Sequence, residues 1–400
     1  MRTKHVLILF VLIEVLFIGS STFAQLSPYQ GIINPYERYG GLGGSFGGVI
    51  IAEPDVVPSP LDNPAGIAFQ RAPQVFAGST TRLSKYDYKY WHSTITESRP
   101  WEAEFAPIQL AVSYPFTMLK KETTLALSAG NIPAPEIETG YTIKEDDLPD
   151  IHHNRSGNVG NVTIGYSIKT TPSLSIGLSY TRWLGNWEWE DYGLPDPVIE
   201  GSYNHGKGKF QYNGNSFNFG MNKQIQRFAI GILVQSPFTL MKGRDITLQV
   251  WEYKTSIAVE QKVNGAAAIG VSYRLSDYAK LGIGYRYQDK LKMVIKNFYD
   301  TEIENSIDIH KLSVAGEYTV KWNSTAIPVY LAWQHSWLKE NSENALGYLI
   351  TTAGKKDQIQ NSVQLGLNWS FKSLGIHLAA IWQQYQNDIQ IRNSQIPPYS

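Results

Sequence analysis

Two adjacent histidines carry the clearest metal-binding chemistry in this 400-residue sequence. His152 and His153 follow the carboxylates Asp146, Asp147 and Asp150, and imidazole and carboxylate groups are both common metal ligands. Neighbouring side chains of an extended chain point to opposite sides, however, so the two rings are poorly placed to share one ion. We therefore expect a solvated polar loop here, with no metal and no cofactor.

The other histidines of the mature chain do not indicate a catalytic site. No recognisable serine or aspartate partner motif accompanies any of them, and we expect that the protein is not an enzyme. Because a triad can also be assembled from residues that are distant in sequence, an enzyme stays open as an alternative. These histidines are His92, His205, His310, His335 and His377.

A glycine-rich run at residues 40–48 could suggest a phosphate-binding loop. Such a loop ends in Gly-Lys-Ser/Thr or lies between a strand and a helix, and this run does neither. Lys+Arg and Asp+Glu both number 35, so the net charge of zero indicates no basic surface for nucleic acid. The chain has no cysteine, which excludes disulfides, iron–sulfur clusters and thiolate zinc sites.

Two groups of aromatic residues could contact apolar molecules. One is a tryptophan series whose odd spacing places Trp183, Trp187 and Trp189 on one face of a strand. The other follows the first expected strand and includes Tyr90 and Trp91. Two interpretations stay open for both groups: an aromatic belt at a membrane interface, or a surface in the outer loops that captures an apolar ligand.

The N-terminus has the three parts of a secretory signal peptide. Arg2 and Lys4 precede an apolar run from Val6 to Ile18, and small residues follow, with Thr22 and Ala24 at the expected cleavage site. The alternative is an anchoring helix, but this run is too short to cross a bilayer, which needs about 20 residues. We predict a signal peptide over residues 1–24 and a mature chain that begins at Gln25.

Beyond residue 74 apolar and polar residues alternate with a period of two. From Val363 to Phe371 all odd positions are apolar and all even positions are small or polar, and 174–181 and 280–287 follow the same pattern. Alternation of this kind places one set of side chains on each face of a β-strand. Several strands also place a glycine on the polar face, Gly177 and Gly270 among them, which either leaves volume in the lumen or lets something approach the backbone closely.

This pattern predicts a transmembrane antiparallel β-barrel over residues 75–400. The expected connections between strands are alternately short and long, as in outer-membrane barrels. A soluble β-sandwich gives no reason for connection lengths to alternate in this way. A weak alternation at 388–396 would complete fourteen strands, the even number typical of such barrels. Thirteen strands are expected, near 75–83, 105–116, 123–132, 158–169, 174–189, 207–225, 228–240, 254–276, 279–298, 305–320, 327–341, 358–371 and 374–386.

Residues 25–74 lack the alternation and instead contain the glycine run and several prolines. A compact irregular segment inside a barrel needs small residues to fit and prolines to set its bends, so we predict a plug, or hatch, over 25–74. The candidate hatch residues are Gly41, Gly43, Gly44, Gly47, Asn63, Pro64 and Ala65. We expect Asn63 to hydrogen-bond its own turn, as Asn before Pro commonly does, and Asn63-Pro64-Ala65 to anchor the plug to the barrel. The alternative is a rigid turn into the first strand.

The glycine run, the acidic residues Glu53 and Asp55 and the motif Asn63-Pro64-Ala65-Gly66 resemble the N-terminal hatch of the long-chain fatty-acid transporter family of outer-membrane proteins. The segment 228–238, which ends in Ser-Pro-Phe, is similar to a strand of that family, and the resemblance covers about residues 36 to 386. It implies a fourteen-stranded barrel in the bacterial outer membrane, plugged by its N-terminal segment, that passes hydrophobic, fatty-acid-like molecules by passive diffusion. The expected partners are outer-membrane lipid and lipopolysaccharide and a hydrophobic small molecule, with no nucleic acid, and the chain is expected to be a monomer. Related barrels serve protein secretion, so a non-transporting barrel that docks a secretion or surface-assembly partner is the alternative.

Overall fold

The protein is described from a computed structural model. The described residues are 47–52, 60–84, 87–89, 96–98, 102–132, 141–145, 148–195, 203–250, 253–296, 302–322, 325–342, 356–371 and 374–387. The predicted signal peptide, most of the glycine run and the weak final strand at 388–396 lie outside these residues.

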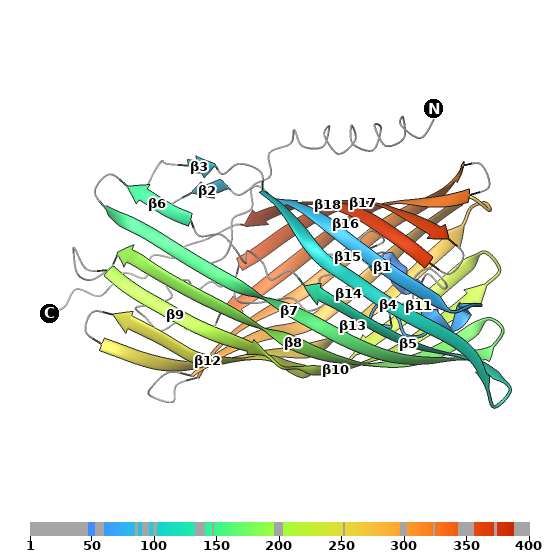
Figure 1. Ribbon diagram of the computed structural model, residues 1–400, viewed down its shortest axis with the longest axis horizontal. Coiled ribbons are helices and arrows are strands. Elements are labelled where there is room, and N and C mark those ends of the chain that lie inside the picture. Colours follow the sequence, from blue (N-terminus) through green and yellow to red (C-terminus); the bar gives the residue numbers. More distant parts are fainter. Residues whose placement is uncertain are drawn as a thin grey trace.

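The described chain is almost entirely extended, and Figure 1 shows long tilted strands side by side. Two short 3-10 helices, η1 (Gly47–Ala52) and η2 (Gly66–Phe69), precede the strands. Among the described residues no helix has the length and apolar character needed to cross a membrane. The strands are β1 Gln74–Ser84, β2 Asp87–Lys89, β3 Thr96–Ser98, β4 Glu102–Met118, β5 Lys121–Ile132, β6 Tyr141–Glu145, β7 Leu148–Thr171, β8 Leu174–Pro195, β9 Tyr203–Tyr212, β10 Asn215–Ile225, β11 Phe228–Gln235, β12 Phe238–Val250, β13 Tyr253–Arg274, β14 Ala279–Lys296, β15 Glu302–Trp322, β16 Thr325–Ser342, β17 Lys356–Phe371 and β18 Leu374–Asn387.

One sheet of 16 strands forms the wall of the molecule. Most pairings in the sheet are antiparallel, and the pairing of β7 with β8 closes a ring that consists of β8, β9, β12 to β18, β1, β4, β5 and β7. The antiparallel β-barrel predicted from the sequence is therefore confirmed. The ring also contains one parallel pairing, in which β1 lies beside β18 with Val75 opposite Leu374. The expected total of fourteen strands depended on 388–396, which lie outside the described residues.

Two of the expected strands are each broken into two. The segment 207–225 forms β9 and β10, which separate at Asn213–Gly214 and both pair with β8. The segment 228–240 forms β11 and the start of β12, which separate at Ser236–Pro237 and both pair with β13. Proline has no N–H to donate and so interrupts a hydrogen-bonded ladder. The wall thus has a local irregularity across two adjacent strands.

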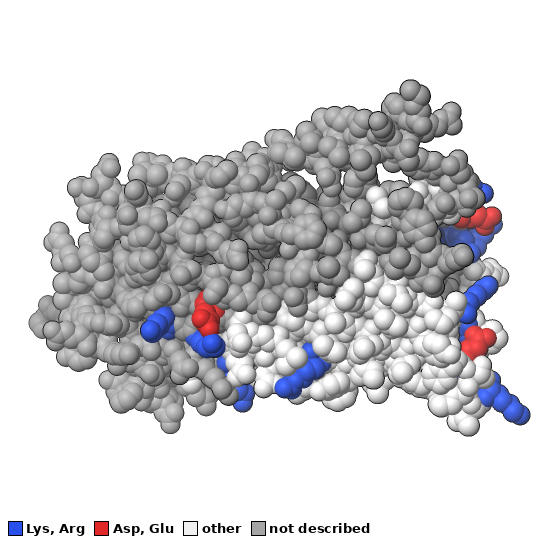
Figure 2. All heavy atoms as spheres, viewed as in Figure 1, with Lys and Arg blue, Asp and Glu red and all other residues white. Residues whose placement is uncertain are grey.

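The barrel is apolar outside and polar inside. In β10 the exposed residues include Phe217 and Phe219, whereas Ser216 and Asn218 are fully buried. Leu178, predicted to face lipid, is 53% exposed on the outside, which confirms its expected face. In Figure 2 the charged side chains of described residues lie at the right-hand end and at the left border of the white surface, with one basic side chain between them, and the rest of the white surface is uncharged. This is the distribution expected of a wall surrounded by lipid.

The turns at one end of the barrel are short, as predicted. Between β4 and β5 the turn is Leu119–Lys120, and both residues have positive φ (52° and 62°), which suits a two-residue hairpin. At the opposite end the prediction of long loops was partly wrong, because the strands continue further. The expected loop at 241–253 is mostly strand, since β12 reaches Val250 and β13 begins at Tyr253. A strand that extends beyond the bilayer is wet on both faces and needs no alternation, so hydropathy does not reveal it.

Candidate functional site

An irregular segment of the chain lies against the inner face of the barrel. We call residues 47–52 and 60–70 the inner segment. Every residue from 60 to 70 is buried, and so are Val49, Ile51 and Ala52. In this segment η1 packs against β11 and β13 to β16, and η2 packs against β5, β7, β8 and β10. The inner segment therefore covers a wide part of one side of the interior.

Asn63 holds the two parts of the inner segment together. Its side-chain oxygen accepts a hydrogen bond of 3.0 Å from the backbone N–H of Ala65, which closes the turn around Pro64. Its side-chain nitrogen donates to the carbonyl of Ile51 at 2.6 Å. Asn63 is only 4% exposed, so both bonds are shielded from water. The structure thus contains the hydrogen bond that the sequence predicted within the turn, and a second one to η1.

A series of barrel glycines leaves room for the inner segment. A Cβ atom on Gly177 would lie 2.6 Å from the amide nitrogen of Ala65, and one on Gly231 would lie 2.8 Å from that of Ala52. Such distances are too short for a real Cβ, so the backbones can meet only where the wall has no side chain. The glycines that make this contact are Gly165, Gly177, Gly220, Gly231, Gly270 and Gly282, which come from β7, β8, β10, β11, β13 and β14.

Polar side chains of the wall bind the backbone of the inner segment. Ser175 of β8 donates to the carbonyl of Ala65 at 2.8 Å. Asn222 of β10 donates to the carbonyl of Ala52 at 3.2 Å. Both wall residues are completely buried. These bonds satisfy carbonyl groups that an irregular segment would otherwise bury without a partner.

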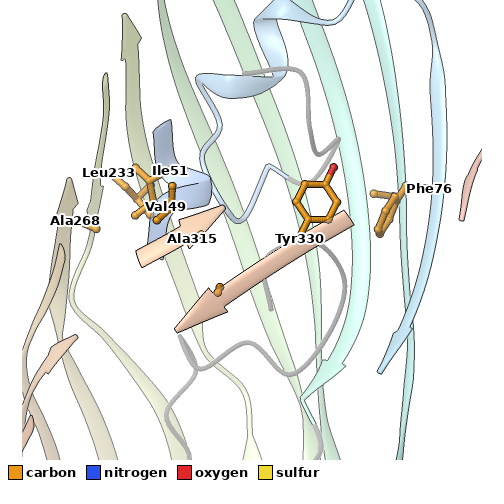
Figure 3. Close-up of a cluster of buried hydrophobic side chains, with 9 residues drawn as sticks. Val49, Ile51, Phe76, Leu233, Ala268, Ala315 and Tyr330 are labelled. Carbon is orange, nitrogen blue, oxygen red and sulfur yellow. The ribbon is translucent and has the colours of Figure 1, made fainter. Parts of the chain in front are cut away.

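Apolar contacts complete the attachment. Figure 3 shows Val49 and Ile51 of η1 beside Leu233 of β11, while Phe76 and Tyr330 lie further along the same buried cluster. Tyr330 is 1% exposed and reaches the interior from β16, on the part of the ring that leads to β1. The inner segment is thus held by apolar packing as well as by hydrogen bonds.

Of the predicted hatch residues, Asn63, Pro64 and Ala65 lie together in the buried turn, and Gly47 is the first residue of η1. Gly41, Gly43 and Gly44 lie outside the described residues, as do Tyr90 and Trp91 of the proposed capture surface. Trp187 and Trp189 belong to β8, in register with Phe210 and Gly208.

The structure corrects the interpretation of Trp183. The two interpretations of the sequence, an aromatic belt at the membrane interface and a capture surface in the outer loops, both require an exposed Trp183. In the structure this side chain is 0% exposed and lies on the inner face of β8. Its indole N–H donates to the hydroxyl of Ser216 at 3.1 Å, and its ring stacks on Phe238 at 6.1 Å between centroids. The alternation of 174–181 puts odd positions on the polar face, so Trp183 lies inside although its own side chain is apolar.

The histidine pair is also placed differently from the prediction. His152 and His153 belong to β7, where they pair with Tyr192 and Asp191 of β8, so they lie in a strand and not in a loop. Among the described residues no group of three or more histidine and carboxylate side chains could hold a metal ion.

Sequence reasoning missed several residues that contact the inner segment, including Ser175, Gly220 and Asn222. The signal for the glycines was present, because Gly177 and Gly270 had been noted on the polar face of their strands. No comparable signal marks Ser175 and Asn222, since small polar residues occupy most inward positions of this wall.

The fold and this site define a transmembrane antiparallel β-barrel with an N-terminal segment packed inside. No family model matches the chain, and no curated protein matches it in sequence. Its fold is similar to solved structures of the toluene transporter TbuX from Ralstonia pickettii (TM-score 0.51, 15% identity, 89% of this chain and 100% of that one) and of the monoaromatic hydrocarbon channel CymD (TM-score 0.57, 11% identity, 87% and 93%). It is also similar to a FadL homologue from Pseudomonas aeruginosa (TM-score 0.52, 12% identity, 92% of each chain). At these identities the likeness establishes the fold.

Proposed function

We propose that the protein is a bacterial outer-membrane channel through which hydrophobic molecules, fatty acids among them, diffuse passively, and that the inner segment is its gate. The observation that supports this most directly is the attachment of the inner segment to the wall through close contacts with glycines such as Gly177 and through hydrogen bonds from Ser175 and Asn222. The similar solved structures include a toluene transporter and a monoaromatic hydrocarbon channel, which favours a hydrophobic substrate.

The inner segment suits a gate because it takes no part in the backbone hydrogen bonds that join the strands of the wall. Ser175 and Asn222 of the wall bind it through side-chain hydrogen bonds, whereas neighbouring wall strands such as β7 and β8 are held together by a long series of backbone pairings. Movement of the inner segment would therefore leave the wall intact. Transport of this kind needs no catalytic group, and we propose that the protein is not an enzyme.

The outer face fits lipid as its main partner. Exposed apolar residues such as Leu110, Leu127 and Leu331 cover it, and we propose that outer-membrane lipid and lipopolysaccharide surround a monomer.

The gate is tested by deleting residues 25–48 from the mature protein and measuring conductance in planar lipid bilayers. We expect a folded barrel with raised conductance for small ions, because the segment that leads to the anchored turn is gone, and with reduced selectivity for hydrophobic solutes. Folding is checked by the difference in gel mobility between heated and unheated protein. Unchanged conductance in a folded deletion variant would show that the segment is structural filling.

Ligand binding separates a channel from a barrel that docks a protein partner. The purified protein should bind a long-chain fatty acid saturably and at a fixed ratio. Absence of saturable binding to any apolar ligand, together with stable co-purification of another protein, would contradict the transport function and favour docking of a secretion or surface-assembly partner.

A further inference from the structure

A cluster of buried aromatic and apolar side chains lines the inner face of the wall beside the irregularity between β9 and β12. We call it the aromatic cluster; its members are the buried residues Trp183, Phe210, Tyr212, Leu240 and Met241 and the half-buried Phe238, which stacks on Trp183. Figure 1 shows its strands β8, β9 and β12 next to one another. The outer face of the same strands carries the exposed ion pair Lys209–Glu188, which identifies Phe210 and Tyr212 as inward-facing.

The break in the wall brings these residues together. At the break, the N–H of Trp183 donates to the carbonyl of Gly214 at 2.8 Å and the N–H of Asn213 donates to the carbonyl of Leu240 at 3.1 Å. The indole of Trp183 and the ring of Phe238 are almost parallel, with 9° between their planes. A flat apolar surface therefore forms at the point where two strands change partners.

Tyr212 is the one member whose polar atom has no partner in the structure. Its side chain is 1% exposed, and its hydroxyl makes no hydrogen bond. In the strand pairing it lies opposite Met241 on one side and Gly185 on the other, so neither neighbour supplies a polar side chain. The indole N–H of Trp183, by contrast, is satisfied by Ser216.

A buried hydroxyl without a partner is unfavourable for folding, and most buried polar groups in proteins are paired. Phenylalanine would pack in the same place and would avoid this cost. The hydroxyl of Tyr212 is therefore of use only if it meets a polar atom that the protein itself does not supply.

We infer that the aromatic cluster is a binding site for an aromatic molecule that carries one oxygen able to accept a hydrogen bond, and that the hydroxyl of Tyr212 donates to this oxygen. The inference rests on the proposed function, because a ligand must enter the barrel to reach this site. Met241 is unbranched and adaptable, so it can move aside for a ring that stacks with Trp183 and Phe238. The site selects oxygenated aromatic compounds over plain hydrocarbons of the same shape.

The test compares three ligands that differ in one group: naphthalene, 1-naphthol and 1-methoxynaphthalene. Their binding to the purified full-length protein is measured by equilibrium dialysis. One hydrogen bond is worth about 0.5–1.5 kcal/mol, so we expect 1-naphthol and 1-methoxynaphthalene to bind about 2- to 10-fold more tightly than naphthalene.

The variant Tyr212→Phe removes only the hydroxyl. We expect it to bind all three ligands with the affinity that the wild type shows for naphthalene. The matched control is Tyr114→Phe on the outer face, where the side chain is 60% exposed, and it should keep the preference of the wild type.

Equal binding of all three ligands to the wild type would overturn the inference and leave the channel function standing. A preference that Tyr212→Phe retains would also overturn it. Binding of none of the three to the wild type would overturn the inference, and failure of a fatty acid to bind in the same assay would overturn the proposed function as well. If Tyr212→Phe does not fold, the ligand series on the wild type alone still decides whether the site prefers an oxygen.

Discussion

Gly177 of the barrel wall lies directly against the backbone of Ala65 in the inner segment. A Cβ atom on Gly177 would stand 2.6 Å from the amide nitrogen of Ala65. Next to this contact, Ser175 donates a hydrogen bond to the carbonyl of Ala65 at 2.8 Å. The wall therefore provides both the space and the polar partner that hold the turn around Pro64 in place.

The first prediction concerns this contact. We expect Gly177→Ala to displace the inner segment and to lower the free energy of unfolding by about 1–3 kcal/mol, as overpacking commonly does. The measurement is urea unfolding in lipid vesicles, with bilayer conductance as a second readout that should rise. The matched control is Gly316→Ala, whose Cβ would meet only the end of the Leu281 side chain, at 3.3 Å. A Gly177→Ala variant as stable and as closed as this control would contradict the role of the contact.

The second prediction concerns Asn63. Asn63→Ala removes the hydrogen bonds to Ala65 and Ile51. It leaves the buried N–H of Ala65 without this partner and the carbonyl of Ile51 with the longer bond of 3.5 Å from Asn222. A buried group without a partner costs about 1–3 kcal/mol, so we expect the inner segment to loosen while the barrel stays folded. Single-channel recordings should show frequent openings. Asn186→Ala, at an exposed position of β8, is the control and should behave like the wild type. Closed channels in the Asn63→Ala variant would argue against the anchor.

The third prediction tests the lipid-facing side of the wall. Leu178 is 53% exposed on the outer face of β8. An arginine there would cost about 2–4 kcal/mol near the middle of the bilayer, so Leu178→Arg should assemble poorly into vesicles. Asn186→Arg lies eight residues further along the exposed face, two residues before the exposed charge of Glu188, and should assemble normally. Assembly is followed by heat-modifiable gel mobility, and normal assembly of Leu178→Arg would show that this face does not meet lipid.

The fourth prediction concerns an ion pair near the short-turn end of the interior. Lys280 and Glu317 are 3.1 Å apart, and the Glu317 side chain is only 8% exposed. Removal of one partner leaves the other charge poorly solvated, so Glu317→Ala should lower stability by up to about 3 kcal/mol. The double variant Lys280→Met/Glu317→Leu should recover most of this loss, because apolar side chains then replace both charges. Urea unfolding measures both, and a double variant no more stable than Glu317→Ala would contradict this account.

The strands of the wall could be predicted because their pattern is local. Leu178 and Ser179 are neighbours in sequence, and the pleat of a strand places them on opposite faces whatever surrounds them. The pattern stops where the membrane stops, since both faces of the strand are then wet. For this reason the ends of β7, β8 and β12 were placed too early or too late. The break at Asn213–Gly214 was missed because the alternation of buried and exposed positions continues across it.

The candidate site was only partly predictable. The turn at Asn63 and Pro64 could be predicted from these two residues, because the side chain of Asn63 bonds within three residues of chain. Its partner Ile51 could not, since that contact depends on how the two parts of the inner segment fold together.

The sequence by itself thus determined the period of the strands, the polar and apolar sets of each strand and the irregular character of the segment before them, because all of these follow from neighbouring residues. Only the tertiary structure decided what the large side chain of Trp183 meets, which is the ring of Phe238 and not lipid. It also decided which wall residues meet the inner segment, as in the bond between Ser175 and Ala65, which are 110 residues apart. Closure of the ring creates both contacts, and no local pattern carries information about which distant strands closure brings together.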